Sequence, residues 1–390
     1  MIARIVTWAV EKRWLVLLLT VIVAAIGAFS LYRLPIDAVP DITNNQVQIN
    51  VRAPALSPEL VEKQVSFPIE TALAGTPGLE YTRSLSRNGF AQITAVFSDA
   101  TDIYFARQQV GERLRGVQEN LPDGVNPEMG PIATGLGEVY MYTVRLDHRE
   151  DDKHKPGEPG QQPDGSYITP EGERLTTEED KATYLRTAQD WIVTPLLKTT
   201  PGLAGVDSIG GYAKQFLVVP DVQKLASLGI TLTDLGNALE RNNTSVGGGF
   251  VNRNGEGLAV RSDALVRNAS ELARTVIATR NGVPITVEQV ATVKTGQAIR
   301  MGSASENGTE VVVGTAIMRI GENSRIVSTA VAEKLKTINA SLPPDVVIQP
   351  VLNRTELVNS TIKTVAKNLS EGAVLVIVVL FLLLGNFRAA

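Results

Sequence analysis

The feature that most constrains this chain is an uninterrupted apolar stretch near its start. Residues 14–31 carry no charge, and Thr20 and Ser30 provide their only hydroxyl groups. At about 1.5 Å per residue, a helix of this length nearly crosses a hydrocarbon core of roughly 30 Å. A second apolar run covers residues 373–384, so the long middle of the chain is predicted to lie on one side of a membrane.

The flanking charges predict the orientation of this first span. Arg4, Lys12 and Arg13 precede it against a single acidic residue, so the positive-inside rule places the N-terminus in the cytoplasm. A cleaved signal peptide is disfavoured because bulky residues, not a small-x-small pattern, follow the run. Twelve apolar residues are short for a bilayer, so the second helix is predicted to begin near Asn368. The predicted segments are residues 1–13 (cytoplasmic N-terminus), 14–32 (first transmembrane helix) and 368–385 (second transmembrane helix).

Composition excludes several classes of protein. The net charge of −4 gives no reason to expect a nucleic-acid partner, and the absence of cysteine rules out disulfides and thiolate metal sites. The sequence has no P-loop, no G-x-S-x-G elbow and no H-E-x-x-H motif, and it contains only 2 histidines. We therefore expect neither an enzyme nor a resident cofactor, and membrane lipid is the expected surrounding of the two spans.

The first part of the exported region shows a β-α-β-β-α pattern. A strand is predicted over residues 46–52, where polar and apolar residues alternate, and a helix over 58–74 after Ser57 and Pro58. Asn88-Gly89 is a strong hairpin signal between two further strands, and a helix follows. One more strand would complete a ferredoxin-like split βαβ sandwich. The remaining predicted elements are strands 79–86 and 90–97 and helix 102–120.

The pattern then recurs. PGLEYTRSLSRNGFAQ from Pro77 and PGLAGVDSIGGYAKQ from Pro201 share Pro, Gly, Leu and Ser at equal offsets, which indicates an internal duplication. The second copy is predicted to have a strand, a helix and another pair of strands, and a third strand–helix–strand pattern follows it. These elements are strand 139–146, helix 184–199, a strand pair within 201–219, and then strand 311–320, helix 323–340 and strand 346–352.

Two insertions interrupt the repeats. Residues 147–181 are rich in Gly, Pro and charge, which predicts a surface loop or small hairpin. Residues 221–294 contain a predicted helix at 233–241, the glycine-rich stretch 246–250, and a hairpin turn at Asn254-Gly255. This glycine-rich hairpin is interpreted either as a contact to a neighbouring subunit or as a flexible surface loop, and the sequence leaves both open.

Several long motifs resemble one transporter family, the resistance-nodulation-division (RND) efflux pumps, and within it the heavy-metal cation pumps of the cobalt–zinc–cadmium type. The resemblance covers the whole chain except the 147–181 insertion, and it implies the N-terminal portion of a longer pump. The motifs are LPIDAVPDIT (34–43), TRSLSRNG (82–89), GPIATGLGEVY (130–140), IGENSR (320–325) and LSEGAVLVIVVLFLLLGNFRAA (369–390).

The resemblance implies an α+β membrane protein in which two transmembrane helices flank a periplasmic region of repeated ferredoxin-like porter subdomains, with an inserted docking subdomain. The helix at 102–120 would be the pore helix at the centre of a trimer. The implied divisions are residues 40–134 (first porter subdomain), 138–209 with 289–352 (second porter subdomain, including the third βαβ pattern), 147–181 (surface insertion) and 210–288 (docking subdomain).

The implied function is proton-driven export of divalent Zn, Co, Cd or Ni cations by a homotrimer of the bacterial inner membrane. The homotrimer would join a periplasmic adaptor protein and an outer-membrane channel, and the resemblance places the proton-relay residues in a later membrane helix. Two alternatives remain: a two-span membrane-anchored periplasmic sensing or assembly module, and an RND pump for organic compounds. An aromatic content of 5% slightly disfavours the organic substrates.

Glu138 is the leading site residue. The resemblance implies that an acidic residue at this position takes part in the substrate cation site, whereas copper and silver pumps carry a non-acidic residue there. Carboxylate oxygen suits borderline or hard divalent ions, and Cu(I) prefers sulfur ligands, of which the 5 methionines form no cluster. The alternative is a solvated glutamate at the start of a strand.

Other charged residues have weaker signals. His148 and His154 lie beside acidic residues in the insertion and could bind Zn²⁺, although such loops are usually only solvated. Arg107, Arg113 and Arg115 on the predicted pore helix either pair across a trimer or face water. Glu371 stands at the predicted membrane boundary, where a structural role is favoured over a functional one.

Overall fold

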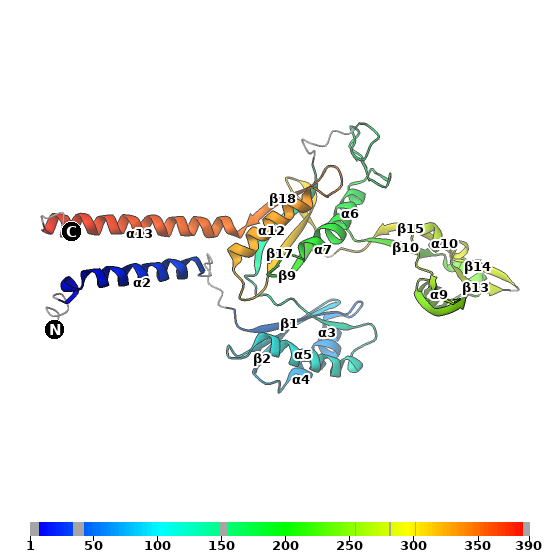
Figure 1. Cartoon of the computed structure of the whole chain (residues 1–390). Helices are drawn as coiled ribbons and strands as arrows, with labels where there is room; N and C mark the ends of the chain where they lie inside the picture. The colour runs from blue at the N-terminus through cyan, green and yellow to red at the C-terminus, as the bar shows by residue number, and fades with distance from the viewer. Residues whose placement is uncertain are drawn as a thin grey trace.

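The computed structural model describes residues 8–33, 43–147, 155–253, 255–280, 282–300 and 302–384. It contains two α/β units, a lobe inserted into the second of them, and two long helices (Figure 1). The helices extend from one side of the α/β units, and the inserted lobe extends from the opposite side (Figure 1). The motif at residues 34–42, predicted to be extended, lies outside the described residues.

The first unit is a four-stranded antiparallel sheet with the order β2-β3-β1-β4, covered by helices. Both helices begin at polar caps: the Ser57 hydroxyl accepts from the Leu60 amide, and Asp102 accepts from the amides of Tyr104 and Phe105. Gly89 has φ +71° in the hairpin turn, which confirms the predicted β-hairpin. The elements are β1 Gln46–Arg52, α3 Pro58–Val61, η1 Glu62–Ser66, α4 Phe67–Leu73, β2 Leu79–Arg87, β3 Phe90–Phe97, α5 Ile103–Val117, η2 Gln118–Asn120 and β4 Asn126–Met129.

The second unit repeats this strand order across an interrupted sequence. β5 lies between β18 and β17, and β17 also pairs with β9, so the order β9-β17-β5-β18 matches that of the first unit. The third predicted strand–helix–strand pattern therefore supplies the second half of this sheet. Its elements are β5 Glu138–Leu146, α6 Glu178–Ala188, η3 Gln189–Val193, α7 Thr194–Leu197, β9 Leu203–Ile209, β16 Ala304–Glu306, β17 Thr309–Met318, α12 Ser324–Asn339 and β18 Val346–Asn353.

One predicted strand pairing in the second copy is wrong. β9 and the following β10 (Lys214–Pro220) are not partners, because β9 pairs with β17 and β10 pairs with β15 (Ala291–Gln297). Gly210 and Gly211 separate them with φ +88° and +61°, and the chain turns away there instead of folding back. The predicted helix at 184–199 also begins six residues earlier, at Glu178, because Thr177 caps the Asp180 amide.

The helix after the first strand of each unit contains a π-helical turn followed by a proline. Pro68 follows η1 and Pro195 follows η3, each as the second residue of the next α-helical segment. Proline has no N–H, and its ring clashes with the carbonyl four residues earlier, so the backbone widens at that place. The same irregularity at equivalent places in both units supports the duplication inferred from the sequence.

The described part of the 147–181 insertion forms a small three-stranded sheet: β6 Gly160–Gln161, β7 Tyr167–Ile168 and β8 Arg174–Leu175. The insertion was predicted to be a surface loop or small hairpin, but it also contributes to the core, because Tyr167 is fully buried in the core of the second unit. The Tyr167 hydroxyl donates to the Pro344 carbonyl at 2.8 Å, and the Gln161 amide donates to buried Asp345 at 2.7 Å. The last residues of the insertion belong to α6.

The inserted lobe is connected to the second unit by the β10–β15 ribbon and has its own small core, which includes Leu225, Leu235 and Val287. The predicted helix and hairpin are both present, and a bulge between Gly247 and Phe250 interrupts the hairpin. Asn254 of the predicted turn lies outside the described residues. The elements are α8 Val222–Ser227, α9 Leu232–Arg241, β11 Ser245–Arg253, β12 Glu256–Asp263, α10 Ala269–Ala273, β13 Val276–Arg280, β14 Val283–Thr286 and α11 Val287–Val290.

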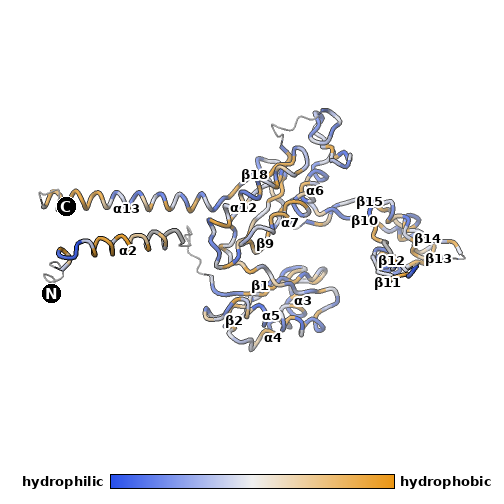
Figure 2. Tube along the Cα trace, in the orientation of Figure 1, coloured by the Kyte–Doolittle hydropathy of each residue, from blue (hydrophilic) through white to orange (hydrophobic). Residues whose placement is uncertain are grey.

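Two helices carry the apolar runs, α2 (Arg13–Arg33) and α13 (Arg354–Leu384). Within the described residues one helix, Arg354–Leu383, is long and apolar enough to cross a membrane, and Arg13–Gly27 is a shorter apolar helix. The hydropathy of α2 is high along much of its length, whereas that of α13 is high mainly towards the C-terminus (Figure 2). The prediction that the last helix begins near Asn368 is wrong, because the helix follows directly from β18 at Arg354.

Candidate functional site

Glu138 is the first residue of β5, the strand in the middle of the second sheet, and its side chain is exposed. The pairing with β17 is irregular at this end, because Ala316 faces Tyr140 and Ile317 faces Glu138, which leaves Val139 without a counterpart. Such a bulge bends the strand and redirects the neighbouring side chains, and bulges are common beside functional sites. β18 pairs with β5 only as far as Tyr140, so Glu138 has β17 as its single neighbouring strand in the sheet.

A segment that crosses from the first unit to the second leads into Glu138. This crossover, residues 130–137, is bonded to the first unit through the Gly130 amide, which donates to the Gln48 carbonyl at 2.8 Å. Its other end is bonded to the second unit, because the Met318 amide donates to the Gly137 carbonyl at 2.7 Å. A Cβ at Gly137 would lie 3.0 Å from the Met318 carbonyl oxygen, so glycine permits this close approach.

The Glu138 carboxylate makes no ion pair or hydrogen bond with the described residues, which leaves its oxygens available as ligands. No group of three or more His, Cys, Asp or Glu side chains that could hold a metal ion occurs in the described part of the chain. Divalent cations take four or more ligands in protein sites. Fewer than three such side chains therefore gather at Glu138 among the described residues, which is too few to complete a cation site.

The other predicted metal-binding residues are not brought to this position. His148 and His154 lie outside the described residues. Asp147, next to them, pairs with Arg145 at 2.6 Å, and Arg145 also reaches Glu306 at 3.2 Å. On α13, Glu371 lies 3.8 Å from Lys367, one helical turn away, and both side chains are mostly exposed in the described chain.

The three arginines of α5 have different environments. The Arg107 guanidinium donates to the Gly130 carbonyl at 2.8 Å, and burial lowers the pKa of Arg107. Arg107 thus binds the start of the crossover, a role that sequence reasoning did not predict. Arg113 lines a groove described below, and Arg115 is exposed.

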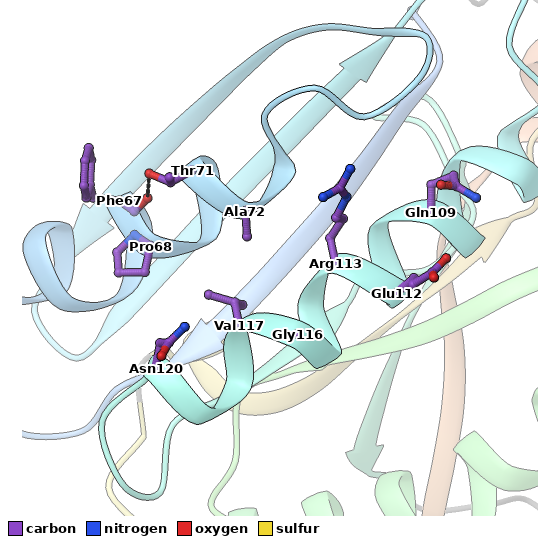
Figure 3. Close-up of a pocket in the computed structure, with 10 residues that line it drawn as sticks. All are labelled: Phe67, Pro68, Thr71, Ala72, Gln109, Glu112, Arg113, Gly116, Val117 and Asn120. Atoms are coloured by element: carbon purple, nitrogen blue, oxygen red, sulfur yellow. Dashed lines mark hydrogen bonds between the residues drawn. The ribbon is translucent and has the colours of Figure 1, made fainter.

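A groove of about 780 Å³ runs between α4 and α5 on the first unit (Figure 3). Its lining combines apolar residues with polar and charged residues such as Gln109, Glu112 and Arg113, and a Cβ added at Gly116 would meet nothing within 4 Å. Phe67 at its edge is 64% exposed although it is fully apolar. An exposed aromatic beside an open groove is typical of a protein–protein contact rather than of a cation site.

Burial of tyrosine distinguishes the core of the second unit. Burial raises the pKa of Tyr142, whose hydroxyl accepts a hydrogen bond from fully buried Gln189 at 3.1 Å. Burial also raises the pKa of Tyr167, and it raises the pKa of Tyr184 to about 12, with the Glu171 carboxylate contributing. The rings of Tyr167 and Tyr184 lie 5.3 Å apart. The tyrosines stabilise the second unit, and they do not touch the Glu138 carboxylate.

The α+β architecture is that of the AcrB/AcrD/AcrF family, and the sequence matches the model of this family over residues 5–390. The chain therefore belongs to that family, as the sequence motifs predicted.

Its relatives lie in the heavy-metal branch. The chain is 57% identical to the nickel-cobalt-cadmium resistance protein NccA of Alcaligenes xylosoxydans xylosoxydans, over 100% of this chain and 36% of NccA. It is 49% identical to the cobalt-zinc-cadmium resistance protein CzcA of Cupriavidus metallidurans, over 100% of this chain and 35% of CzcA. A crystal structure of a heavy metal efflux pump superposes with a TM-score of 0.82 at 31% identity, covering 98% of this chain and 36% of that one. The chain thus spans about a third of the length of the relatives it matches.

Proposed function

We propose that this chain is the N-terminal portion of a proton-driven pump that exports divalent heavy-metal cations through a tripartite complex. The observation that carries the proposal is the match along the whole chain to proteins named for nickel, cobalt, cadmium and zinc resistance, at 49–57% identity. These names favour a metal cation over an organic compound as the cargo. In this proposal the cation is substrate rather than resident cofactor, and no residue of the chain performs a chemical step.

Within this proposal both apolar helices span the inner membrane. The 21 residues of α2 would cover about 30 Å, close to the thickness of the hydrocarbon core. Lys12 and Arg13 at its start favour a cytoplasmic N-terminus, so both α/β units and the inserted lobe would be periplasmic. Both units have the β-α-β-β-α-β sequence and the strand order of a ferredoxin-like sandwich, which supports their assignment as porter subdomains.

Glu138 would supply one ligand of the transported cation. Carboxylate oxygen is a suitable ligand for Zn²⁺, Co²⁺, Ni²⁺ and Cd²⁺, and the exposed Glu138 carboxylate has no competing partner among the described residues. Because a single carboxylate cannot complete a coordination shell, the remaining ligands would come from outside the described residues of this chain.

The test is Glu138→Gln in the complete pump, assayed for resistance to Zn²⁺, Co²⁺, Ni²⁺ and Cd²⁺ in a strain that lacks other exporters. We expect resistance to fall at least tenfold for the transported cation with unchanged protein level. The matched control is Glu80→Gln, because Glu80 is an exposed glutamate near the start of β2 in the first unit. Unchanged resistance in the Glu138 variant would contradict the ligand role.

The α4–α5 groove supports a homotrimeric assembly with contacts through α5. The apolar edge at Phe67 and the open floor at Gly116 would accept a neighbouring copy (Figure 3). Gly116→Trp should fill the groove and weaken the trimer, whereas Gly116→Ala has space for its methyl group and should leave the trimer intact. Native mass spectrometry of the detergent-solubilised pump distinguishes these outcomes. A periplasmic adaptor and an outer-membrane channel would complete the complex.

A further inference from the structure

The crossover that leads to Glu138 is bound at each end by an arginine through a main-chain carbonyl. Arg107 donates to the Gly130 carbonyl at 2.8 Å at the beginning of the crossover. Arg354 donates to the Leu136 carbonyl at 2.6 Å at its end, two residues before Glu138. Arg107 belongs to the first unit, but Arg354 is the first residue of α13, the long helix with the apolar C-terminal half (Figures 1 and 2). The two ends of the crossover are thus bound to different bodies.

The first turn of α13 is firmly attached to the second unit. Asn353 accepts a hydrogen bond from the Thr355 amide at 3.0 Å, and the same oxygen accepts from the fully buried Ser328 hydroxyl at 3.0 Å. Ser328 also lies 3.3 Å from the carbonyl oxygen of Val139, the residue after Glu138. Val358, one turn into α13, is fully buried. The Asn353 side chain therefore links the start of α13, through Ser328 of α12, to the residue after Glu138.

The Leu136 carbonyl and the Glu138 backbone are mechanically connected. A peptide unit is planar, so the direction of the Leu136 carbonyl fixes the plane that contains the Gly137 nitrogen. Gly137 is buried against Met318, and its amide donates to the Thr134 carbonyl at 3.0 Å, which limits the rotation left to this residue. The Gly137 carbonyl also accepts from the Met318 amide, so a shift of the Leu136 carbonyl is passed through this restrained residue to the exposed and bulged start of β5 at Glu138.

We propose that Arg354 is a positioning residue that connects the start of α13 to the cation-binding carboxylate of Glu138. A change in the direction of α13 acts through its attached first turn, shifts the guanidinium against the Leu136 carbonyl and changes the direction of the Glu138 side chain. The affinity of this position for the cation then depends on the position of α13. This inference rests on the proposed function, because it takes Glu138 as a ligand of the transported cation.

The test uses the complete pump reconstituted in liposomes, with Zn²⁺ or Co²⁺ alone as the transported ion, and separates KM from kcat. Arg354→Met removes the donors but keeps much of the side-chain volume, and we expect KM for the cation to rise on the order of tenfold. Arg354→Lys keeps a charged donor and should restore part of that loss. Arg325→Met is the matched control, because Arg325 is an exposed arginine on α12, and its KM should stay unchanged.

A double-mutant cycle separates this inference from the proposed function. If Arg354 acts through Glu138, the Arg354→Met and Glu138→Gln double variant should have the same KM as Glu138→Gln alone. Additive effects, or a rise in KM that lysine does not reduce at all, would overturn the positioning role while leaving the Glu138 ligand role intact. An unchanged KM in Glu138→Gln would instead overturn the ligand role, and the inference about Arg354 with it. If Arg354→Met does not fold, Arg354→Lys becomes the test. Its KM for the cation must then be higher than that of the parent pump, and an unchanged KM would contradict the positioning role.

Discussion

The two α/β units have the same strand order but carry different features. The first unit is continuous in sequence, and its central strands pair two fully buried isoleucines, Ile49 and Ile93. In the second unit the corresponding strands pair Tyr142 with Gly314, and a Cβ at Gly314 would overlap the tyrosine ring. A duplicated fold thus has one plain copy and one with large–small packing, two insertions and the candidate cation ligand. The comparison shows that the same strand order accommodates both a plain core in the first unit and two insertions with a candidate cation ligand in the second.

The largest expected difference between the units is in alkaline solution. Tyrosine in an unfolded chain ionises near pH 10, whereas burial raises the pKa of Tyr184 to about 12 and raises those of Tyr142 and Tyr167 as well. Between pH 10 and 12 the unfolded state binds fewer protons than the folded state, so stability falls as pH rises. We expect the second unit to unfold in this range, and hydrogen exchange with mass spectrometry should show it.

The core of the first unit contains no tyrosine among the described residues, so its protection from exchange should persist to higher pH. Simultaneous loss of protection in both units would show that they unfold as one body and would remove the distinction between them.

The next largest effect is expected from Tyr142→Ala. Removing a buried aromatic side chain costs about 3–5 kcal/mol, and here the loss would also uncover Gly314 and leave Gln189 without one hydrogen-bond partner. Ile93→Val in the first unit is the comparison and should cost about 0.5–1.5 kcal/mol. Guanidinium unfolding of the chain in detergent, followed by circular dichroism, gives both values. Equal losses of stability would mean that the pairing of Tyr142 with Gly314 contributes no more to stability than the pairing of Ile49 with Ile93.

A smaller effect is expected where the insertion meets the second unit. Asp345 is fully buried with φ +57°, and its carboxylate accepts from the Gln161 amide. Asp345→Ala removes that hydrogen bond and places alanine in a left-handed conformation, at a combined cost of about 2 kcal/mol. Residues 155–177 should exchange faster in this variant, whereas exposed Asp123→Ala should change nothing. Unaltered exchange would show that other contacts hold the insertion.

The smallest effect concerns the caps of the two equivalent helices. Thr177 accepts from the Asp180 amide at 3.1 Å, and Ser57 accepts from the Leu60 amide at a longer 3.4 Å. Thr177→Ala should cost about 1 kcal/mol, and Ser57→Ala should cost less because its hydrogen bond is weaker. Unfolding measurements on the two variants give the loss of stability for each cap. A larger loss for Ser57→Ala than for Thr177→Ala would contradict this prediction.

Local signals in the sequence predicted the first unit well, because Ser57, Asp102 and Asn88-Gly89 each determine a helix start or a turn nearby. The second sheet was harder, since the partner of β9 lies about a hundred residues later and no local pattern indicates that pairing. The early start of α13 was missed because polar residues such as Lys363 and Lys367 hide a helix that apolar counting cannot detect. Glu138 was identified through the family motif, whereas Arg354 was not, because its partner is a main-chain carbonyl 218 residues away.

The central position of β17 also determines the order in which the chain can fold. Every strand of the first sheet has been synthesised once Met129 is made, so that sheet can close early. The second sheet cannot, because β5 and β9 have no contact with each other until Thr309–Met318 arrives between them. During that interval the inserted lobe is synthesised while two unpaired strand edges stay exposed. The second unit is therefore the part of this chain most in need of protection from aggregation during synthesis.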